Sequence, residues 1–445
     1  MELTQLAYVC FFLPLSIVLY YLTFRRGRPV TLAVLSVVFL LFVSPVLALC
    51  ATVATLGCYL CAVHIYRSRF SLVRRRIGLF AGLVLCMGIF SAYIWREGMA
   101  ARGAIMLATV ILGAFSYLMD LYRGEDNHLH PFGSFAAYCL FFGKLVYGPL
   151  VRADEFIAQL PRVRASAREM GRGIFTFFIG LAQLLILADS LHIVENYISE
   201  APIQSLLTLA MRTLIIGLGW YFLLSGYSNI AQGTGLLFGI DLPRNHAYPF
   251  GATSFGSYFG RFLITQNSYA RTYLAPLLGG GERVGSGNIL AVAATAAFAG
   301  LWIGFPGGAV WGGAFGLLIW AERLMPGGRG RFDGLRRTVV FAVGAVSFCL
   351  LLPDNGLGYV AELGAMFADL GSLPFYTELS FYMLIYFLPL VLLSLLLATR
   401  LIQGISSFLK SKQPLVYSSA VFLWGLGLMT ICLSAMIHKG GWPAL

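Results

Sequence analysis

The sequence predicts an all-α polytopic integral membrane protein, and three observations support this fold class. Of its 445 residues, 59% are hydrophobic and only 11% are charged, and the mean hydropathy is +0.81. Soluble domains carry about 25% charged residues, so lipid must solvate most of this chain. Apolar runs long enough for a hydrocarbon core of about 30 Å recur from end to end. We therefore expect about 11 transmembrane helices plus one or two re-entrant segments.

The first five spans are expected at 4–24, 30–46, 47–66, 77–95 and 104–122. The first run lacks a basic leading region and a small-residue cleavage site, so we expect a retained helix rather than a signal peptide. Arginines follow in short loops, at 25–28 and again at 67–76. The positive-inside rule places both loops in the cytoplasm, which puts the N-terminus outside and the loop at Arg123 inside.

The next apolar segment, 132–151, is expected to be a re-entrant hairpin that dips in from the cytoplasm. A full crossing would carry the five arginines of the 152–172 loop to the outside, against the positive-inside rule. The apolar pattern is also interrupted, and irregular backbone at membrane depth is tolerated only where protein or a wet cavity surrounds it. We expect an acyl donor or carrier to dock on the side of the protein that carries Lys144, Gly148, Pro149 and Arg152.

The second half begins with long apolar runs at 173–191 and 205–240. We expect the second run to form two elements, because Gly226-Tyr227-Ser228-Asn229 interrupts it. Residues 250–283 are unusually polar for a membrane protein. Apolar runs resume at 288–304, 308–324, 338–352, 379–402 and 416–437. No internal repeat is evident, so a single transmembrane domain, 1–445, is the simplest partition.

Two function classes are disfavoured by composition. The net charge of +12 could suggest nucleic acid, but the arginines are confined to short loops, where topology requires them, and no aromatic platform accompanies them. Eight cysteines are spread through apolar runs. Cys58 and Cys61 have a CxxC spacing without a second pair, so we expect small buried hydrophobic residues and no metal site.

Five blocks between roughly 110 and 370 point to a family. They cover 115–124, 141–152, 226–245, 258–280 and 300–323, the last containing Gly300-Leu301-Trp302-Ile303-Gly304. In this order they resemble the membrane-bound O-acyltransferase (MBOAT) family, in its bacterial branch of alginate O-acetylation and teichoic acid D-alanylation. The resemblance implies a ring of tilted helices around a thin centre, where a funnel from each face meets the active site.

The same resemblance implies that the histidines of the family's active site are missing from this chain. Acyl transfer to a hydroxyl needs a base within hydrogen-bond reach, and histidine suits this role. The family's histidine between Trp and Gly falls at Ile303, a second one falls at Leu263, and a further one, with a possible offset, falls at Phe315. None of these three residues can carry a proton, so the sequence leaves it open whether the protein is an enzyme.

Polar groups that could line the site remain nearby. These candidates are Trp302, Gln266, Asn267, Ser268, Arg261, Arg271, Tyr227 and Asn229. The amides and the hydroxyl offer hydrogen bonds but no effective base at neutral pH. The two arginines could bind phosphate or carboxylate, or pair with backbone carbonyls. Among the six histidines, His246 borders the polar segment most closely.

Three hypotheses follow. The first is a diverged O-acyltransferase of the bacterial inner membrane that moves an acyl group from acyl-CoA or an acyl-carrier thioester toward an exported alginate-like exopolysaccharide. It would work with membrane lipid and a periplasmic acyltransferase-like or carrier protein, and with no bound cofactor. The alternative is a catalytically inactive scaffold, regulator or acyl/lipid-binding conduit in a cell-envelope polymer system. A secondary transporter is disfavoured, because transporter folds are commonly built from internal repeats.

Overall fold

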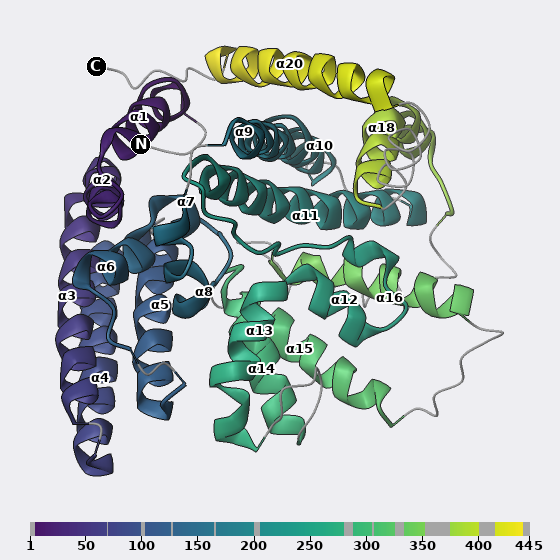
Figure 1. Cartoon of the computed structure of the whole chain (residues 1–445). Helices are drawn as coiled ribbons and strands as arrows, with labels where there is room; N and C mark the ends of the chain where they lie inside the picture. The colour runs from purple at the N-terminus through teal and green to yellow at the C-terminus, as the bar shows by residue number, and fades with distance from the viewer. Residues whose placement is uncertain are drawn as a thin grey trace. The chain divides into compact units, whose positions relative to one another are not determined.

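The described residues form helices joined by short irregular segments (Figure 1). The computed structural model describes residues 5–68, 70–98, 103–125, 128–163, 166–199, 205–279, 288–304, 307–324, 333–351, 374–399 and 414–438. Within these ranges, seven helices are long and apolar enough to cross a membrane, and four shorter apolar helices accompany them. The predicted all-α polytopic fold class is confirmed.

The chain divides into two compact units. The first takes in Met1–Phe178, Tyr227–Arg244 and Leu433–Leu445, and the second takes in Ile179–Gly226 and Asn245–Cys432. Each unit is discontinuous in sequence, because α9 (Ala167–Ala182), α11 (Leu206–Leu237) and α20 (Pro414–His438) each pass from one unit to the other. A single domain over 1–445 stays a prediction.

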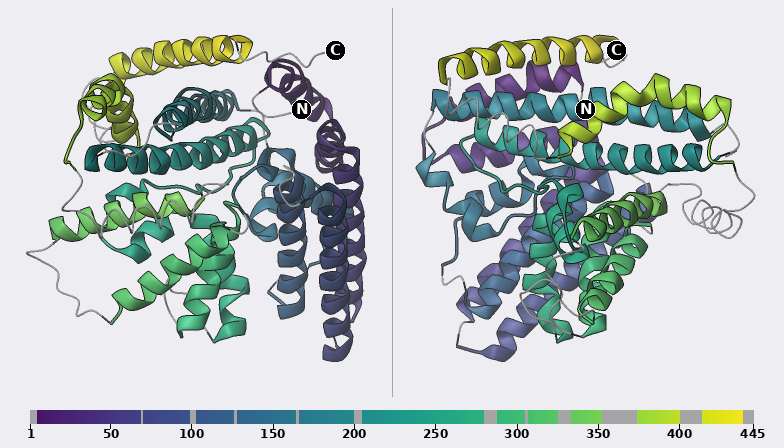
Figure 2. Two further views of the ribbon diagram at one scale, coloured as in Figure 1. Left: turned by 180° about the vertical axis from the view of Figure 1, so that it is seen from behind. Right: turned by 90° about the vertical axis from the view of Figure 1, so that its right-hand side faces the viewer.

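The first unit is built around a layer of long helices. Its elements are η1 (Ala7–Phe12), α1 (Leu13–Leu22), α2 (Arg28–Val43), α3 (Pro45–Arg67), α4 (Leu72–Glu97), α5 (Gly103–Arg123), α6 (Phe132–Leu140), α7 (Phe142–Leu145), α8 (Ala153–Ile157) and η2 (Leu160–Arg162). Helices α3, α4 and α5 run side by side (Figures 1 and 2). Phe80, Val84 and Met87 of α4 are exposed, as expected of a face that meets lipid.

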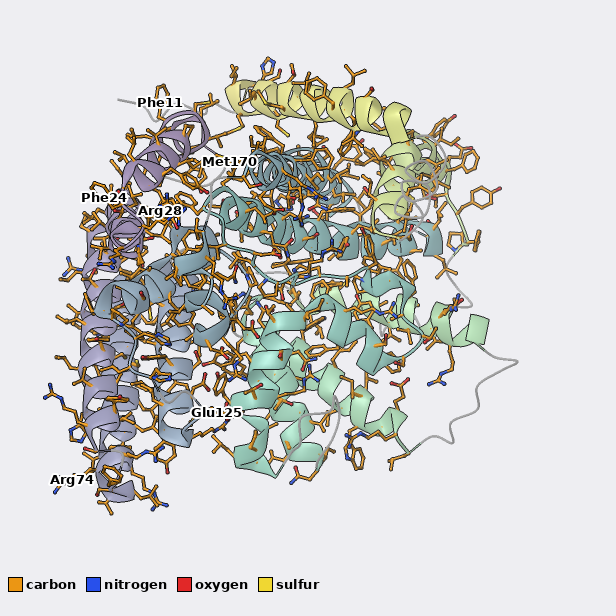
Figure 3. All side chains as sticks on the ribbon, viewed as in Figure 1. Phe11, Phe24, Arg28, Arg74, Glu125 and Met170 are labelled. Carbon is orange, nitrogen blue, oxygen red and sulfur yellow. The ribbon has the colours of Figure 1, made fainter. Side chains whose placement is uncertain are left out.

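The loops around 67–76 and Arg123, which the positive-inside rule assigns to the cytoplasm, lie at one end of this layer. Arg75 Nη2 donates to the carbonyl of Leu121 at 3.1 Å. Arg74 and Glu125 likewise lie at the lower end of the layer in Figure 3. The loops around 67–76 and Arg123 therefore share one end, as the positive-inside rule predicts.

The segment 132–151 doubles back along α5. Before it, the amide of His130 donates to the hydroxyl of Tyr117. At its far point, the hydroxyl of Thr109 donates to the carbonyl of Leu145, about 12 Å further along α5 at 1.5 Å per residue. After it, Arg152 lies 3.7 Å from Asp120, back at the starting end. These contacts give the segment the path expected of a re-entrant hairpin.

The second unit carries the polar segment and the last apolar helices. Its elements are η3 (Gln183–Ala188), α10 (Asp189–Ser199), η4 (Pro249–Gly251), α12 (Phe255–Phe262), α13 (Ile264–Tyr273), η5 (Ala275–Leu278), α14 (Ile289–Leu301), α15 (Gly307–Glu322), α16 (Asp333–Ser347), η6 (Phe348–Leu351) and α18 (Glu378–Leu397). The break expected within 205–240 is wrong, because α11 continues through it. A Cβ at Gly226 would lie 2.8 Å from Leu184 Cγ and 3.0 Å from the carbonyl oxygen of Gly180, so this glycine serves close packing rather than a turn.

Helices α14 and α15 pack through small residues. Gly300, Gly308, Gly312 and Gly316 fall on their shared surface, and a Cβ at Gly300 would collide with the carbonyl oxygen of Gly308. Small residues at four-residue spacing let two membrane helices approach backbone to backbone, where dispersion contacts replace the missing hydrophobic driving force.

Gly312→Ala is expected to destabilise the protein, while Gly313→Ala leaves its stability almost unchanged. At Gly312 the added methyl would collide with the carbonyl of Ala296 and lie 3.0 Å from the Cα of Ala297, both backbone atoms that cannot rotate away. Overpacking of this kind costs about 1–3 kcal/mol. At Gly313 the nearest atom is the Cβ of Ala297 at 3.8 Å, an ordinary contact. Thermal unfolding in detergent measures both, and equal melting temperatures would contradict the packing described.

Candidate functional site

A carboxylate anchors the polar segment to two neighbouring helices. Glu322 at the end of α15 accepts a hydrogen bond from the amide of Gly256 in the first turn of α12 at 3.3 Å, and it pairs with Arg336 of α16 at 3.0 Å. A negative charge at a helix N-terminus is favourable. Ser254 caps the same helix by accepting from the amide of Ser257. Glu322 thus fixes α12, a role that the sequence did not suggest.

The break between α12 and α13 falls at Leu263, one of the family's histidine positions. Asn245, which is 1% exposed, holds the break in place. Its side-chain oxygen accepts from the amide and the hydroxyl of Thr265 at 3.1 and 2.8 Å, and its carbonyl accepts from the amide of Ile264. The sequence contained this asparagine at the end of its third block, without indicating its partner.

The three positions that the resemblance assigns to histidine lie in an apolar interior. Leu263, Ile303 and Phe315 are 0%, 2% and 1% exposed. The ring of Phe315 packs against Trp311 and Tyr258, with centroids 4.9 and 5.4 Å apart. Aromatic and aliphatic side chains therefore occupy the space in which proton-carrying residues are expected by resemblance.

Helices α13 and α14 are antiparallel, which brings the polar candidates to the tryptophan. Asn288 donates to the carbonyl of Leu278 at one end of the pair, and Tyr269 stacks on Phe298 further along. This register places Gln266 and Asn267 level with the turn that holds Trp302.

Among the described residues, three buried nitrogen donors at this level have no hydrogen-bond partner. They are Gln266 Nε2, Asn267 Nδ2 and Trp302 Nε1, on side chains whose residues are 1%, 4% and 5% exposed. Leaving a buried donor unpaired costs about 1–3 kcal/mol, so each such group calls for an explanation. A ligand that supplies hydrogen-bond acceptors would provide one.

The remaining candidates of the polar segment are engaged or face outward. Arg261 donates to the carbonyl of Gly251 at 3.2 Å, and Arg271 donates to the carbonyl of Asn267 at 3.2 Å. Both arginines thus make the carbonyl contacts considered as the alternative to anion binding. Ser268 is exposed on α13.

Tyr227 and Asn229 belong to the first unit, with the donor-side candidates. The ring of Tyr227 packs against Tyr147, which has a positive φ of 49° and directly precedes Gly148. A Cβ at Gly148 would collide with the backbone of Lys144, so only glycine fits before Pro149 in this turn.

Lys144 lies at the far point of the re-entrant segment and is 2% exposed. Its Nζ lies 3.9 Å from the ring centroid of Tyr138 and 5.4 Å from that of Phe156, a cation–π arrangement. Ionisable groups buried at membrane depth are costly and usually functional. Arg152 at the mouth of the segment pairs with Glu125 at 3.1 Å and Asp154 at 3.4 Å.

His246, the histidine nearest the polar segment, is buried against aromatic rings. Its ring packs edge-on against Phe262, with centroids 5.3 Å apart. Burial lowers the pKa of His246 to about 4. The backbone groups of Phe262 and Leu224 act to raise this pKa, but their effect is smaller. The imidazole is neutral at pH 7 and is a weaker base than an ordinary histidine.

The chain is similar in sequence to curated O-acetylation proteins. No family model matches the chain. It is 24% identical over 380 residues to a probable alginate O-acetylase AlgI of Pseudomonas putida, which covers 80% of this chain and 78% of the relative. A Pseudomonas aeruginosa protein of the same name is 26% identical over 48% of this chain and 41% of its own length. A Helicobacter pylori peptidoglycan O-acetyltransferase is 31% identical over 34% of this chain and 30% of its own length.

Proposed function

We propose that this chain, as a member of the membrane-bound O-acyltransferase family, serves the O-acylation of an exported cell-envelope polysaccharide through a site that lacks a histidine base. The acyl group would come from a cytoplasmic thioester, either acyl-CoA or an acyl-carrier protein. The acceptor would be a hydroxyl of a polymer outside the membrane.

The observation that supports this proposal most directly is the set of unpartnered donors at Gln266, Asn267 and Trp302. A thioester carbonyl accepts hydrogen bonds, and its oxygen gains negative charge when a hydroxyl attacks. Donors fixed in a water-poor site stabilise that charge strongly. These three N–H groups would hold the acyl carbonyl and stabilise its transition state.

The proton would follow a different route from that in histidine-containing relatives. In the transfer, the carbon–sulfur bond breaks, a carbon–oxygen ester bond forms, and the hydroxyl proton passes to the departing thiolate. A positioned base typically contributes 10²–10⁴-fold in rate. With Leu263 and Ile303 at the base positions, transfer would be slower by roughly that factor.

Lys144 and Arg152 would act on the donor side. Both carry positive charge along the re-entrant segment, and thioester donors carry phosphate groups. A phosphate at the mouth of this segment would compete with Glu125 and Asp154 for Arg152. A periplasmic acyltransferase-like or carrier partner could receive the acyl group before the polymer does.

A vesicle assay tests the proposal. The full chain is reconstituted with acetyl-CoA or an acetyl-carrier protein trapped inside and a polysaccharide outside, and acetyl ester on the polysaccharide is measured by mass spectrometry. We expect slow ester formation that requires both the protein and the internal thioester. Ester formation from thioester supplied only outside would contradict vectorial transfer, and its absence from both sides would contradict catalysis.

A catalytically inactive role is the second candidate, because Leu263, Ile303 and Phe315 lie in a tightly packed apolar interior. In that case the donors bind an acyl group without transferring it. Binding of a non-hydrolysable acetyl-thioether analogue, together with an absence of ester formation in vesicles, would distinguish this role from slow catalysis.

A further inference from the structure

The second unit contains a pocket that none of the family blocks includes. It lies between α10 and α11, which run side by side (Figures 1 and 2), and its volume is about 700 Å³. Ligand sites typically measure 300–1,000 Å³. Its polar lining consists of Asp189, His192, Glu195, Asn196, Ser199 and Arg212.

An ion pair lies in this pocket within candidate membrane spans. Arg212 Nη2 donates to Glu195 Oε1 at 3.4 Å, and the two side chains are only 14% and 12% exposed. The pair lies in the candidate spans Ala167–Ser199 and Leu206–Leu237, whose most apolar windows have mean hydropathies of 2.0 and 1.6. A buried ion pair is weak evidence for stability, because desolvation offsets the attraction. Ionisable groups inside membrane spans instead suggest a functional site.

The two walls of the pocket differ in chemistry. On α10, the polar residues Asp189, His192, Asn196 and Ser199 recur at i, i+3, i+7 and i+10, so they share one helix face over about 15 Å. The facing wall on α11 contributes Ile215, Ile216, Gly219, Trp220 and Leu223. One wall therefore offers hydrogen bonds, and the other offers aliphatic groups and an indole.

We propose that this pocket binds a neutral or amine-bearing saccharide segment of the acceptor polymer. A sugar ring presents hydroxyl groups at its edge and C–H groups on its faces, which match the α10 wall and the Trp220 wall. The carboxylates of Asp189 and Glu195 outnumber the guanidinium of Arg212, so a uronate carboxylate is disfavoured in the pocket. That the saccharide is the acceptor rests on the proposed function; that the pocket binds saccharide does not.

Membrane topology places the pocket on the side of the exported polymer. The arginine-rich stretch 152–172, which runs into the first turns of α9, is assigned to the cytoplasm by the positive-inside rule. The span Ala167–Ser199 then ends outside. Glu195, Asn196 and Ser199 lie in its last two turns, near that outer end.

Direct binding to the purified full chain tests the inference without any acyl donor. The probes are a tetramer of N-acetylglucosamine, a tetramer of glucosamine and a tetramer of mannuronate, measured by titration calorimetry in detergent. We expect the first two to bind, and the mannuronate to bind at least about tenfold more weakly, since tenfold corresponds to about 1.4 kcal/mol. Binding of none, or tightest binding of the mannuronate, would overturn the proposal.

Substitutions in the pocket test whether the saccharide binds there. Asn196→Ala and Glu195→Gln should each weaken saccharide binding about tenfold or more, because a lost hydrogen bond in a buried site costs about 1–3 kcal/mol. Ile193→Ala, on the 65% exposed outer side of α10, should bind as the natural chain does. Asn196→Ala keeps the ion pair, and its thermal unfolding is measured to check that it is folded.

Unchanged saccharide binding in folded Asn196→Ala would overturn the assignment to this pocket. The purified chain could instead retain phosphatidylethanolamine, lose it in Asn196→Ala and bind no saccharide. That result would assign the pocket to a lipid headgroup and would also overturn the saccharide proposal. Saccharide binding without any ester formation in vesicles would instead contradict only the proposed catalysis.

Discussion

The double substitution Leu263→His and Ile303→His is expected to raise the rate of acyl transfer by about 10²–10⁴-fold over the natural chain. Both positions are buried, and burial favours the neutral imidazole, which is the form that accepts a proton. The vesicle assay described above measures the gain as acetyl ester formed per protein per minute.

The matched control is Leu263→Gln with Ile303→Gln, which adds polarity and similar volume but no base. Both double variants bury polar groups in an apolar interior and should lose about 1–3 kcal/mol for each unpaired group, so melting temperatures are compared first. If the histidine variant is folded and no faster than the glutamine variant, the missing base does not limit this protein and the inactive role is favoured.

Trp302→Phe and Gln266→Met are expected to slow transfer by about 10²–10³-fold each, the usual cost of removing one donor to a developing oxyanion. The same substitutions should leave stability unchanged or raise it. Each removes a buried N–H group that has no hydrogen-bond partner in the described part of the chain, and such groups oppose folding by about 1–3 kcal/mol. Lower activity at equal or higher melting temperature is the expected combination.

Ser268→Ala provides the control, because Ser268 lies on the same helix but is exposed. It should change neither quantity. Trp302→Phe could instead melt at a lower temperature and transfer acyl groups as fast as Ser268→Ala does. That result would show that the indole N–H has a structural role.

The path of the 132–151 segment was predictable, whereas the continuity of α11 was not. Arginines at both ends of 132–151 favoured a return to the same side, and the pairing of Arg152 with Asp120 agrees with it. The expected break at 226–229 rested on local propensity. In α11 the tertiary contacts of Gly226 with α9 and of Gly233 with Phe177 supply the reason for glycine instead.

The sequence by itself determined the membrane-embedded α-helical class, and through the family resemblance it predicted that Leu263 and Ile303 stand where relatives carry histidine. Both follow from residue identity and from local periodicity, which need no contact between distant parts of the chain. Only the tertiary structure decided that Gln266, Asn267 and Trp302 keep donors without a partner among the described residues, and that the polar face of α10 borders a pocket. Hydrogen-bond satisfaction and enclosed volume depend on which helices pack together, and those pairings are long-range.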